Sequence, residues 1–303
     1  MEHIFSSLIP IFALIIFGYL FKKISFPSHD FWPMADKLTY YILMPSLLIL
    51  TLSQAKFENN SFELILSSTL AIFLTLLTLV IFNKFNQTNS SSFTSVVQGG
   101  IRFNTYVFLA LSGSIFGSEG LVIAAIIISF AIPILNIFCI SIFAIYSDNQ
   151  KINILFILKS IFKNPLIIAS IIGVLINILG FQMPLSLENF LKILSAAALP
   201  LGLLSIGYAL VLKDIKSAKK DMLVSIIAKF IVLPAFIFFI SKYLELDALA
   251  ISVLVLFAIM PTAPSSFILA RELKGDLQLI TSIITVQTIL ATIFLTIFLN
   301  YFV

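Results

Sequence analysis

Apolar residues occur along this chain in long stretches that lack the alternation of a half-buried β-strand. A helix needs about 20 apolar residues to cross the roughly 30 Å of membrane hydrocarbon, and it satisfies its backbone hydrogen bonds internally. We therefore predict an all-α polytopic membrane protein with ten transmembrane helices. The predicted spans are residues 4–21, 38–54, 62–82, 93–116, 120–146, 164–181, 187–212, 219–243, 247–271 and 277–302.

Composition supports this prediction. Of the 303 residues, 60% are apolar and 11% are charged, and the mean hydropathy is +1.13. A soluble domain carries about 25% charged residues, so this chain has too few charges to cover a soluble surface. Cys139, His3 and His29 stand alone in the sequence, so we expect no disulfide, no metal site and no cofactor.

Lysine and arginine residues concentrate in alternate connections between the predicted spans. Even-numbered connections carry only Lys56, Lys192 and Lys242. Basic residues favour the cytoplasmic side, so we expect a multi-pass protein of the cell (inner or plasma) membrane with both termini outside the cytoplasm. The odd-numbered connections carry 13 of the 18 basic residues: Lys22, Lys23, Lys37, Lys84, Lys151, Lys159, Lys163, Lys213, Lys216, Lys219, Lys220, Arg271 and Lys274.

An internal repeat emerges when the chain is compared with itself at an offset of 155 residues. The offset superposes the first five predicted spans on the last five, so residues 1–150 and 151–303 form two five-helix repeats. An odd number of spans in each repeat inverts the second one relative to the first, as in many secondary transporters. The offset pairs Pro10 with Pro165, Gly18 with Gly173, Phe26 with Phe181, Pro45 with Pro200, and Gly120 with Gly275.

The fourth predicted span contains a polar interruption. Its centre reads Gln98-Gly99-Gly100-Ile101-Arg102-Phe103-Asn104-Thr105-Tyr106. A charge deep in a membrane is costly and persists where a cavity, a partner or a ligand offsets the cost. Arg102 is therefore a candidate anion ligand, with pairing to backbone carbonyls as the structural alternative.

The ninth span corresponds to the fourth under the repeat, and it is interrupted too. Pro261 and Pro264 would break the helix, and Thr262, Ser265 and Ser266 add hydroxyls. Two half-helix N-termini that meet at such breaks would suit an anion. We therefore predict broken crossover helices 4 and 9 with an electropositive pocket between them; a simple proline kink is the alternative.

Lys229 lies ten residues inside the eighth span. It either snorkels towards the membrane surface or faces the binding cavity. Gln287 and Asn136 either line the same site or form interhelical hydrogen bonds. No Asp, Glu or His lies deep in any predicted span, so we expect uniport driven by the membrane potential, or ion coupling through carbonyls and hydroxyls. A proton-coupled mechanism would have to use Lys229 or a carboxylate at a cavity mouth.

At the two interruptions the sequence resembles the auxin efflux carrier family, which includes plant auxin exporters and bacterial malate and malonate permeases. The stretch 102–106 is similar to the Asn-Pro-Asn-Thr-Tyr stretch of the plant members, with Arg102 and Phe103 in place of Asn-Pro. The stretch from Met260 to Leu273 is similar to their ninth helix, and Pro45 resembles the proline of their second helix. The plant members' long central loop is missing, as in the short bacterial type.

The resemblance implies a scaffold domain from spans 1, 2, 6 and 7 and a transport domain from spans 3–5 and 8–10 that moves as an elevator. It implies a small organic anion as substrate, either a carboxylate or an auxin-like acid, and it allows a homodimer. It assigns the binding site to Asn104, Thr105 and Tyr106 in span four and to Pro261, Thr262 and the hydroxyls beside Pro264 in span nine.

We expect a transporter and not an enzyme. The alternatives are a sodium-coupled symporter of the bile-acid type and a non-transporting membrane sensor or intramembrane enzyme. Nucleic-acid binding is not predicted, because the lysines follow the expected inner edge of the membrane. Residues 147–163 combine apolar and lysine positions in a pattern typical of a helix lying on the membrane surface.

Overall fold

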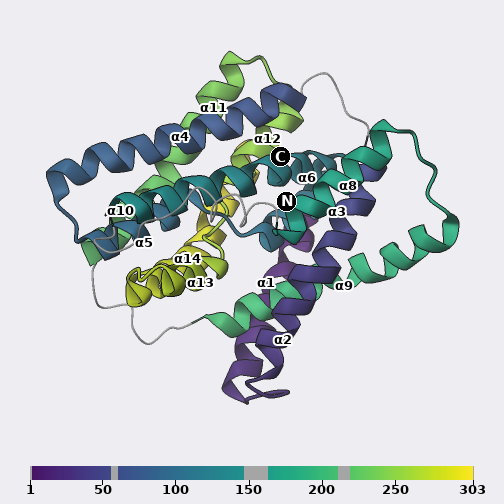
Figure 1. Cartoon of the computed structure of the whole chain (residues 1–303), viewed down its shortest axis with the longest axis horizontal. Helices are drawn as coiled ribbons and strands as arrows, with labels where there is room; N and C mark the ends of the chain where they lie inside the picture. The colour runs from purple at the N-terminus through teal and green to yellow at the C-terminus, as the bar shows by residue number, and fades with distance from the viewer. Residues whose placement is uncertain (1, 56–60, 147–162, 211–218, 303) are drawn as a thin grey trace. The chain divides into compact units, whose positions relative to one another are not determined.

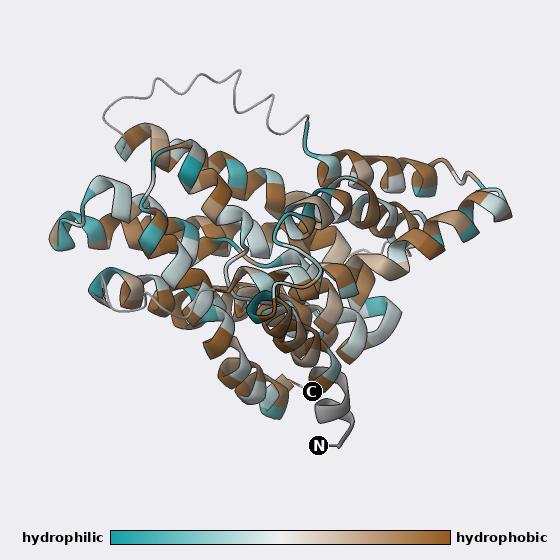
Figure 2. Ribbon diagram, turned by 90° about the horizontal axis from the view of Figure 1, so that it is seen from below, coloured by the Kyte–Doolittle hydropathy of each residue, from teal (hydrophilic) through white to brown (hydrophobic). Residues whose placement is uncertain are grey.

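A computed structural model describes residues 2–55, 61–146, 163–210 and 219–302. These residues form helices joined by short connections and contain no β-strand (Figure 1). Apolar side chains dominate the helices, while polar residues gather mainly near their ends (Figure 2). The predicted surface helix at 147–163 lies almost wholly outside the described residues.

Within the described residues, six helical segments are long and apolar enough to cross a membrane. They are Phe31–Ser53, Ser61–Asn86, Ser90–Tyr146, Leu185–Ala209, Lys220–Tyr243 and Leu277–Phe302. Two shorter apolar helices, α8 (Pro165–Ile178) and α12 (Ala248–Ala258), add to them. The all-α, multi-pass class predicted from the sequence is therefore confirmed, whereas the ten-span inverted repeat stays a prediction.

The second predicted span begins earlier than residue 38. Helix α2 (Phe31–Leu38) continues through a π-helical turn, η1 (Thr39–Leu43), into α3 (Met44–Ser53). A second helix has the same arrangement: α10 (Lys219–Ile227) continues through the π-helical turn η2 (Ala228–Val232) into α11 (Leu233–Tyr243). Pro45 and Pro234 each lie two residues after the last residue of the π turn. Because proline clashes with the preceding helical turn, a wider turn there accommodates it.

The connection between the fourth and fifth predicted spans is shorter than their predicted bounds, 93–116 and 120–146, indicate. Helix α6 (Thr105–Tyr146) contains two helical pieces that meet at Gly117. Gly117 has φ 66° and ψ −153°, a backbone conformation that glycine adopts readily and other residues rarely do. The chain is helical again on both sides of this single residue. The fourth and fifth predicted spans are thus separated by one glycine.

The chain folds into two compact units. Unit 1 comprises Met1–Asn59, Tyr106–Ser129 and Ser160–Leu210. In it, α1 (Glu2–Lys23) packs on α9 (Leu185–Ala209), and α3 packs on α8 and α9. The α1–α9 contact is close, because a Cβ on Gly207 would lie 1.8 Å from the Ile15 carbonyl oxygen.

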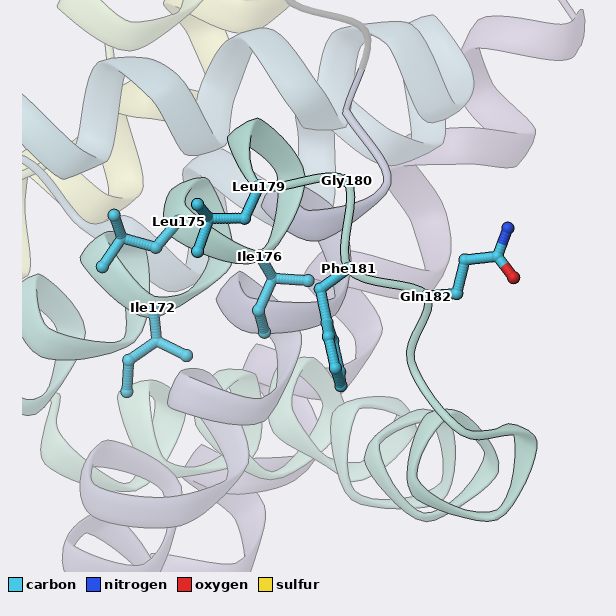
Figure 3. Close-up of a pocket in the computed structure, with 7 residues that line it drawn as sticks. All are labelled: Ile172, Leu175, Ile176, Leu179, Gly180, Phe181 and Gln182. Carbon is cyan, nitrogen blue, oxygen red and sulfur yellow. The ribbon is translucent and has the colours of Figure 1, made fainter.

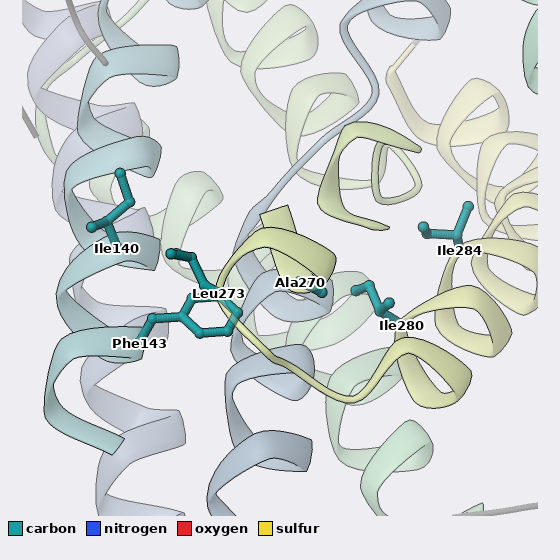
Figure 4. Packing of buried hydrophobic residues seen from close by; sticks show 6 residues of the cluster. All are labelled: Ile140, Phe143, Ala270, Leu273, Ile280 and Ile284. Atoms are coloured by element: carbon teal, nitrogen blue, oxygen red, sulfur yellow. The ribbon is translucent and has the colours of Figure 1, made fainter. Parts of the chain in front are cut away.

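Unit 2 comprises Asn60–Thr105, Phe130–Lys159 and Val211–Val303. Its long helix α4 (Ser61–Asn86) lies beside α11, and α5 (Ser90–Ile101) packs against α10 and α14 (Leu277–Phe302). The short helix α13 (Ser265–Glu272) is anchored at its C-terminal end by an apolar cluster (Figure 4). The cluster joins α6, α13 and α14 through Ile140, Phe143, Ala270, Leu273, Ile280 and Ile284.

Candidate functional site

The break in the ninth predicted span has a local cause. Helix α12 ends at Ala258 and α13 begins at Ser265, so residues 259–264 leave the helical path. Pro261 and Pro264 lack a backbone N–H and disfavour helical geometry in the residues before them. The prolines therefore account for this interruption from the sequence alone.

The break in the fourth predicted span has a different cause. Helix α5 ends at Ile101, Arg102 is extended with φ −75° and ψ 153°, and α6 begins at Thr105. Gly99 and Gly100 lie inside α5 and do not form the break. A Cβ on Gly99 would lie 2.1 Å from Ser225 Oγ and 2.6 Å from Ile283 Cγ2. The glycine at 99 therefore serves close packing of α5 on α10 and α14.

The two breaks contact each other within unit 2. The Asn104 N–H donates a 2.8 Å hydrogen bond to the Pro261 carbonyl oxygen. Asn104 and Pro261 are both buried. This bond joins two backbone segments whose groups have left their own helices, so each break helps satisfy the other.

Gln287 of α14 ties the two breaks to a third helix. Its Oε1 accepts from the Thr262 N–H at 3.0 Å and lies 2.8 Å from Thr262 Oγ1. Its Nε2 donates to the Gly99 carbonyl at 2.9 Å, and Thr262 Oγ1 is also 2.9 Å from that carbonyl. Gln287 and Thr262 are each 0% exposed. Of the two interpretations given above for Gln287, the structure supports the interhelical hydrogen bond, and it engages the Thr262 hydroxyl in the same network.

Arg102 is the residue that directly follows α5 in the first break. Its side chain is half-buried, and its Nη2 lies 3.4 Å from Oγ of Ser265, the first residue of α13. Its Nη1 is buried and has no hydrogen-bond partner, and no carboxylate lies within ion-pair distance among the described residues. The guanidinium therefore stands next to the positive end of a helix dipole with no negative charge opposite it.

The remaining predicted residues of the crossover differ in exposure. Ser265 is exposed, Thr105 and Pro264 are half-buried, and Ser266 is 0% exposed with an Oγ that lacks a hydrogen-bond partner. Gln98 is also 0% exposed, and neither polar atom of its amide is hydrogen-bonded. Buried polar atoms normally find partners, so these side chains are further candidates for contact with a ligand.

Lys229 lies on the π turn η2 and is 0% exposed. Its Nζ has no hydrogen-bond partner and lies 5.9 Å from the ring centroid of Phe257 in α12. The snorkelling alternative is wrong, because the ammonium is enclosed by protein and does not extend to a surface. The Phe257 ring in turn packs on Phe103 at a centroid distance of 4.6 Å, which places Lys229 beside the core of the crossover.

Tyr106 is grouped with unit 1. Its ring packs tightly on α9, since a Cβ on Gly202 would lie 2.6 Å from Tyr106 Cδ2. The other predicted site residues, from Arg102 to Thr105, Lys229, and Pro261 to Ser266, belong to unit 2. A glycine is needed at 202 because any side chain there would displace the tyrosine ring.

An open groove in unit 1 has a different character from the crossover. It lies at the C-terminal end of α8 and along the following turn, and its lining is mostly apolar (Figure 3). None of its lining residues is charged, so it offers no counter-charge for an anion. The lining residues are Ile172, Leu175, Ile176, Leu179, Gly180, Phe181 and Gln182.

Sequence reasoning did not select Gln98 and left the role of Gln287 open. A lone amide in an apolar helix gives no hint of whether it faces a ligand or a neighbouring helix. A sequence feature that could have selected Gln98 is its position four residues before Arg102, about one helical turn away. The hydrogen-bond partners of Gln287 come from α5, from α10 and from the break at 259–264, and they are separated from it by 25 to 188 residues.

Comparison with known proteins identifies the family of this chain. A family described as membrane transport protein matches residues 3–299. The chain is 24% identical over 295 residues to an uncharacterized transporter of Methanocaldococcus jannaschii, with 92% of each chain covered. It is 24% identical over 314 residues to a Rhizobium meliloti protein named as a proposed malonate transporter, with 95% of this chain and 94% of that protein covered. An uncharacterized transporter of Methanothermobacter thermautotrophicus is 24% identical over 289 residues, with 94% of each covered. The chain therefore belongs to the membrane transport protein family, that of the auxin efflux carriers.

Proposed function

We propose that this protein is a secondary transporter that carries a small organic anion across the cell membrane. The observation that carries the proposal is the position of Arg102. An extended, half-buried arginine sits at the N-terminus of α13 with no carboxylate opposite it among the described residues. Both the guanidinium and the helix N-terminus favour an anion. A bound carboxylate would accept hydrogen bonds from the N–H groups of the guanidinium.

The proposed architecture has ten spans in two inverted repeats, residues 1–150 and 151–303. The proposed scaffold domain consists of the first, second, sixth and seventh predicted spans, and these fall in unit 1. Unit 1 also includes Tyr106–Ser129, which lies outside the proposed scaffold. Unit 2 holds the crossover and would be the moving transport domain of an elevator. Both termini would lie outside the cytoplasm, and a homodimer would be the assembly.

The proposed site uses the unengaged groups of the crossover. Arg102 would hold the anionic end of the substrate, with Ser265 and Ser266 as hydroxyl partners and Lys229 as a second positive charge. Thr105, Asn104, Pro261, Thr262 and Pro264 would shape the site. The name of the Rhizobium meliloti relative supports a dicarboxylate as the first substrate to test. Tyr106, which is grouped with unit 1, stays a prediction of the family resemblance.

A ligand panel tests this proposal on protein purified in detergent. We expect malonate, malate or indole-3-acetate to raise the melting temperature, because a ligand that binds the folded state stabilises it by RT ln(1 + [L]/Kd). The neutral analogue malonamide should have no effect. The Arg102→Ala variant should lose the shift, whereas Arg271→Ala, which removes the same charge from an exposed position in α13, should keep it.

Two outcomes would contradict the proposal. One is the absence of a shift with every anion in the wild-type protein. The other is an equal shift in the wild type and in Arg102→Ala. A shift that requires sodium salts and disappears with potassium salts would favour the sodium-coupled symporter instead.

A further inference from the structure

Lys229 is a fully buried amine whose environment does not support a permanent positive charge. The side chain is 0% exposed, and Nζ lacks a hydrogen-bond acceptor among the described residues. Nζ lies over the Phe257 ring at 5.9 Å from the ring centroid, which is a weak cation–π contact. A buried ammonium without an acceptor or counter-charge is costly, and such a group commonly loses its proton.

The elements packed against η2 supply no partner for this amine. Neither α5 nor α12 has an ionisable side chain, and α14 has only Tyr301. None of the charged groups on or next to the neighbouring elements lies within hydrogen-bond or ion-pair distance of Nζ. Those groups are Glu63 and Lys84 on α4, Lys220 and Asp221 on α10, Lys242 and Tyr243 on α11, Asp247 before α12, and Arg102 after α5.

The amine nevertheless lies close to the proposed anion site. The Phe257 ring that faces Nζ packs at 4.6 Å on the ring of Phe103, and Phe103 is the residue between Arg102 and Asn104. Two buried rings therefore connect Lys229 with the first break. An anion at the break would act on a positive charge at Nζ through buried rings and not through water, and charges attract each other more strongly across protein interior.

The backbone at Lys229 gives an independent indication of function. The residue lies within a π-helical turn, and single π turns inside α-helices occur frequently at functional sites. A π turn also shifts the register of the helix, so side chains in and after it point in directions that a regular helix would not give them. Lys229 therefore lies in a π turn that ends two residues before Pro234, and its side chain is buried there.

We propose that Lys229 is a proton-binding site that couples anion binding to the uptake of one proton, which rests on the proposed anion-transport function. In the empty site Nζ is a neutral amine. When the anion binds at the crossover, Nζ takes a proton from solvent and becomes an ammonium that offsets the anion's charge. When the anion leaves, the N–H bond breaks and the proton returns to solvent. The coupling ion would then be a proton, carried with the anion in the same direction.

Binding of malonate to the purified, detergent-solubilised protein at several pH values tests the inference. From about pH 7 to about pH 9 malonate itself does not change charge. The wild-type Kd should rise up to about tenfold per pH unit in this range, because each anion bound takes up one proton. Calorimetry in two buffers with different protonation enthalpies should show this uptake directly.

Two substitutions at 229 should abolish the pH dependence from opposite directions. Lys229→Met removes the proton-binding group, so malonate binding should be weaker and independent of pH. Lys229→Arg carries a permanent charge, since arginine does not lose its proton in proteins, so binding should persist and also be independent of pH. Lys242→Met is the matched control, because Lys242 lies at the same 5.9 Å from an aromatic ring, that of Phe238, but is exposed.

The outcomes separate this inference from the proposed function. Malonate binding that is pH-independent in the wild type, or that keeps its pH dependence in a folded Lys229→Met or Lys229→Arg variant, would overturn the inference and leave the anion site intact. Failure of the wild type to bind any anion of the panel at any pH would overturn both. Loss of the pH dependence in both variants, but not in Lys242→Met, would support Lys229 as the proton site.

Discussion

The two helix breaks of unit 2 look alike in outline but have different physical origins. The break at residues 259–264 contains two prolines three residues apart, which lack a backbone N–H and disfavour helical geometry in the residues before them. The break at residues 102–104 contains no proline and is stabilised from outside, by the Asn104–Pro261 hydrogen bond and by the Gln287 network. The first break along the chain therefore depends on the second.

This dependence explains how an uncompensated arginine is held in place. The prolines fix where α13 begins, and α13 then presents its N-terminus beside Arg102. The apolar cluster at the other end of α13 keeps the helix against α6 and α14. Substitutions that weaken the shared network should therefore disturb the proline-free break more than the proline-containing one.

The largest effect is expected for Gln287→Leu. The substitution removes the bonds to the Thr262 N–H and the Gly99 carbonyl and leaves a buried N–H without an acceptor. We expect a loss of about 2–4 kcal/mol in the free energy of unfolding, measured by thermal or denaturant unfolding in detergent. Gln278→Leu, at an exposed position of the same helix, should change stability by no more than about 0.5 kcal/mol. Equal effects of the two variants would show that the amide does not tie the breaks together.

A smaller loss is expected for Gly99→Ala. The new Cβ would lie 2.1 Å from Ser225 Oγ and 2.6 Å from Ile283 Cγ2, so α5 has to move away from α10 and α14. Overpacking of this kind costs about 1–3 kcal/mol, which should appear as a lower melting temperature.

Gly113→Ala serves as the comparison for this variant. Its Cβ would meet Leu121 Cδ1 at 3.6 Å, an ordinary contact inside a helix, and alanine is the better helix former. This variant should be as stable as the wild type or slightly more stable. A Gly99→Ala protein with unchanged stability would contradict the close packing of α5.

The smallest effects, and the most diagnostic, concern the two arginines next to α13. Without an anion, Arg102 stands at the positive end of this helix and Arg271 in its last turn at the negative end. Arg102→Ala should therefore raise the stability of the ligand-free protein by about 0.3–1 kcal/mol, and Arg271→Ala should lower it by a similar amount at low salt. Melting temperatures of both variants without added anions check this difference in sign. A destabilising Arg102→Ala would indicate that the arginine has a structural partner.

Much of the fold was predictable because its determinants are local. Long apolar runs specify membrane helices without any tertiary information, since lipid imposes the same requirement on every span. Pro261 and Pro264 likewise reveal the second break. The predicted start of the second span was wrong because Phe31–Leu38 is mixed in composition, and its helix continues into the apolar part through a π turn.

The site was only partly predictable, because its groups acquire their roles from distant neighbours. Gly99 and Gly100 belong to the predicted interruption of the fourth span, yet they lie within a helix and serve its packing. Thr262 reads as a free hydroxyl, yet its Oγ1 lies within hydrogen-bond distance of Gln287 and the Gly99 carbonyl. Lys229 reads as a lysine that could reach the membrane surface, yet it is enclosed.

The sequence by itself determined the all-α membrane class, the place of the proline-containing break, and the presence of an arginine in a span that has no acidic residue near its centre. These follow from hydropathy and from the covalent constraint of proline, which act wherever the residue is. Only the tertiary structure decided that the proline-free break meets the other, that Gln287 joins them, and that Lys229 and Arg102 have no counter-charge within the part of the chain that the structure describes. Those features depend on which backbone groups become neighbours once the helices pack, and that information is distributed over residues far apart in the chain.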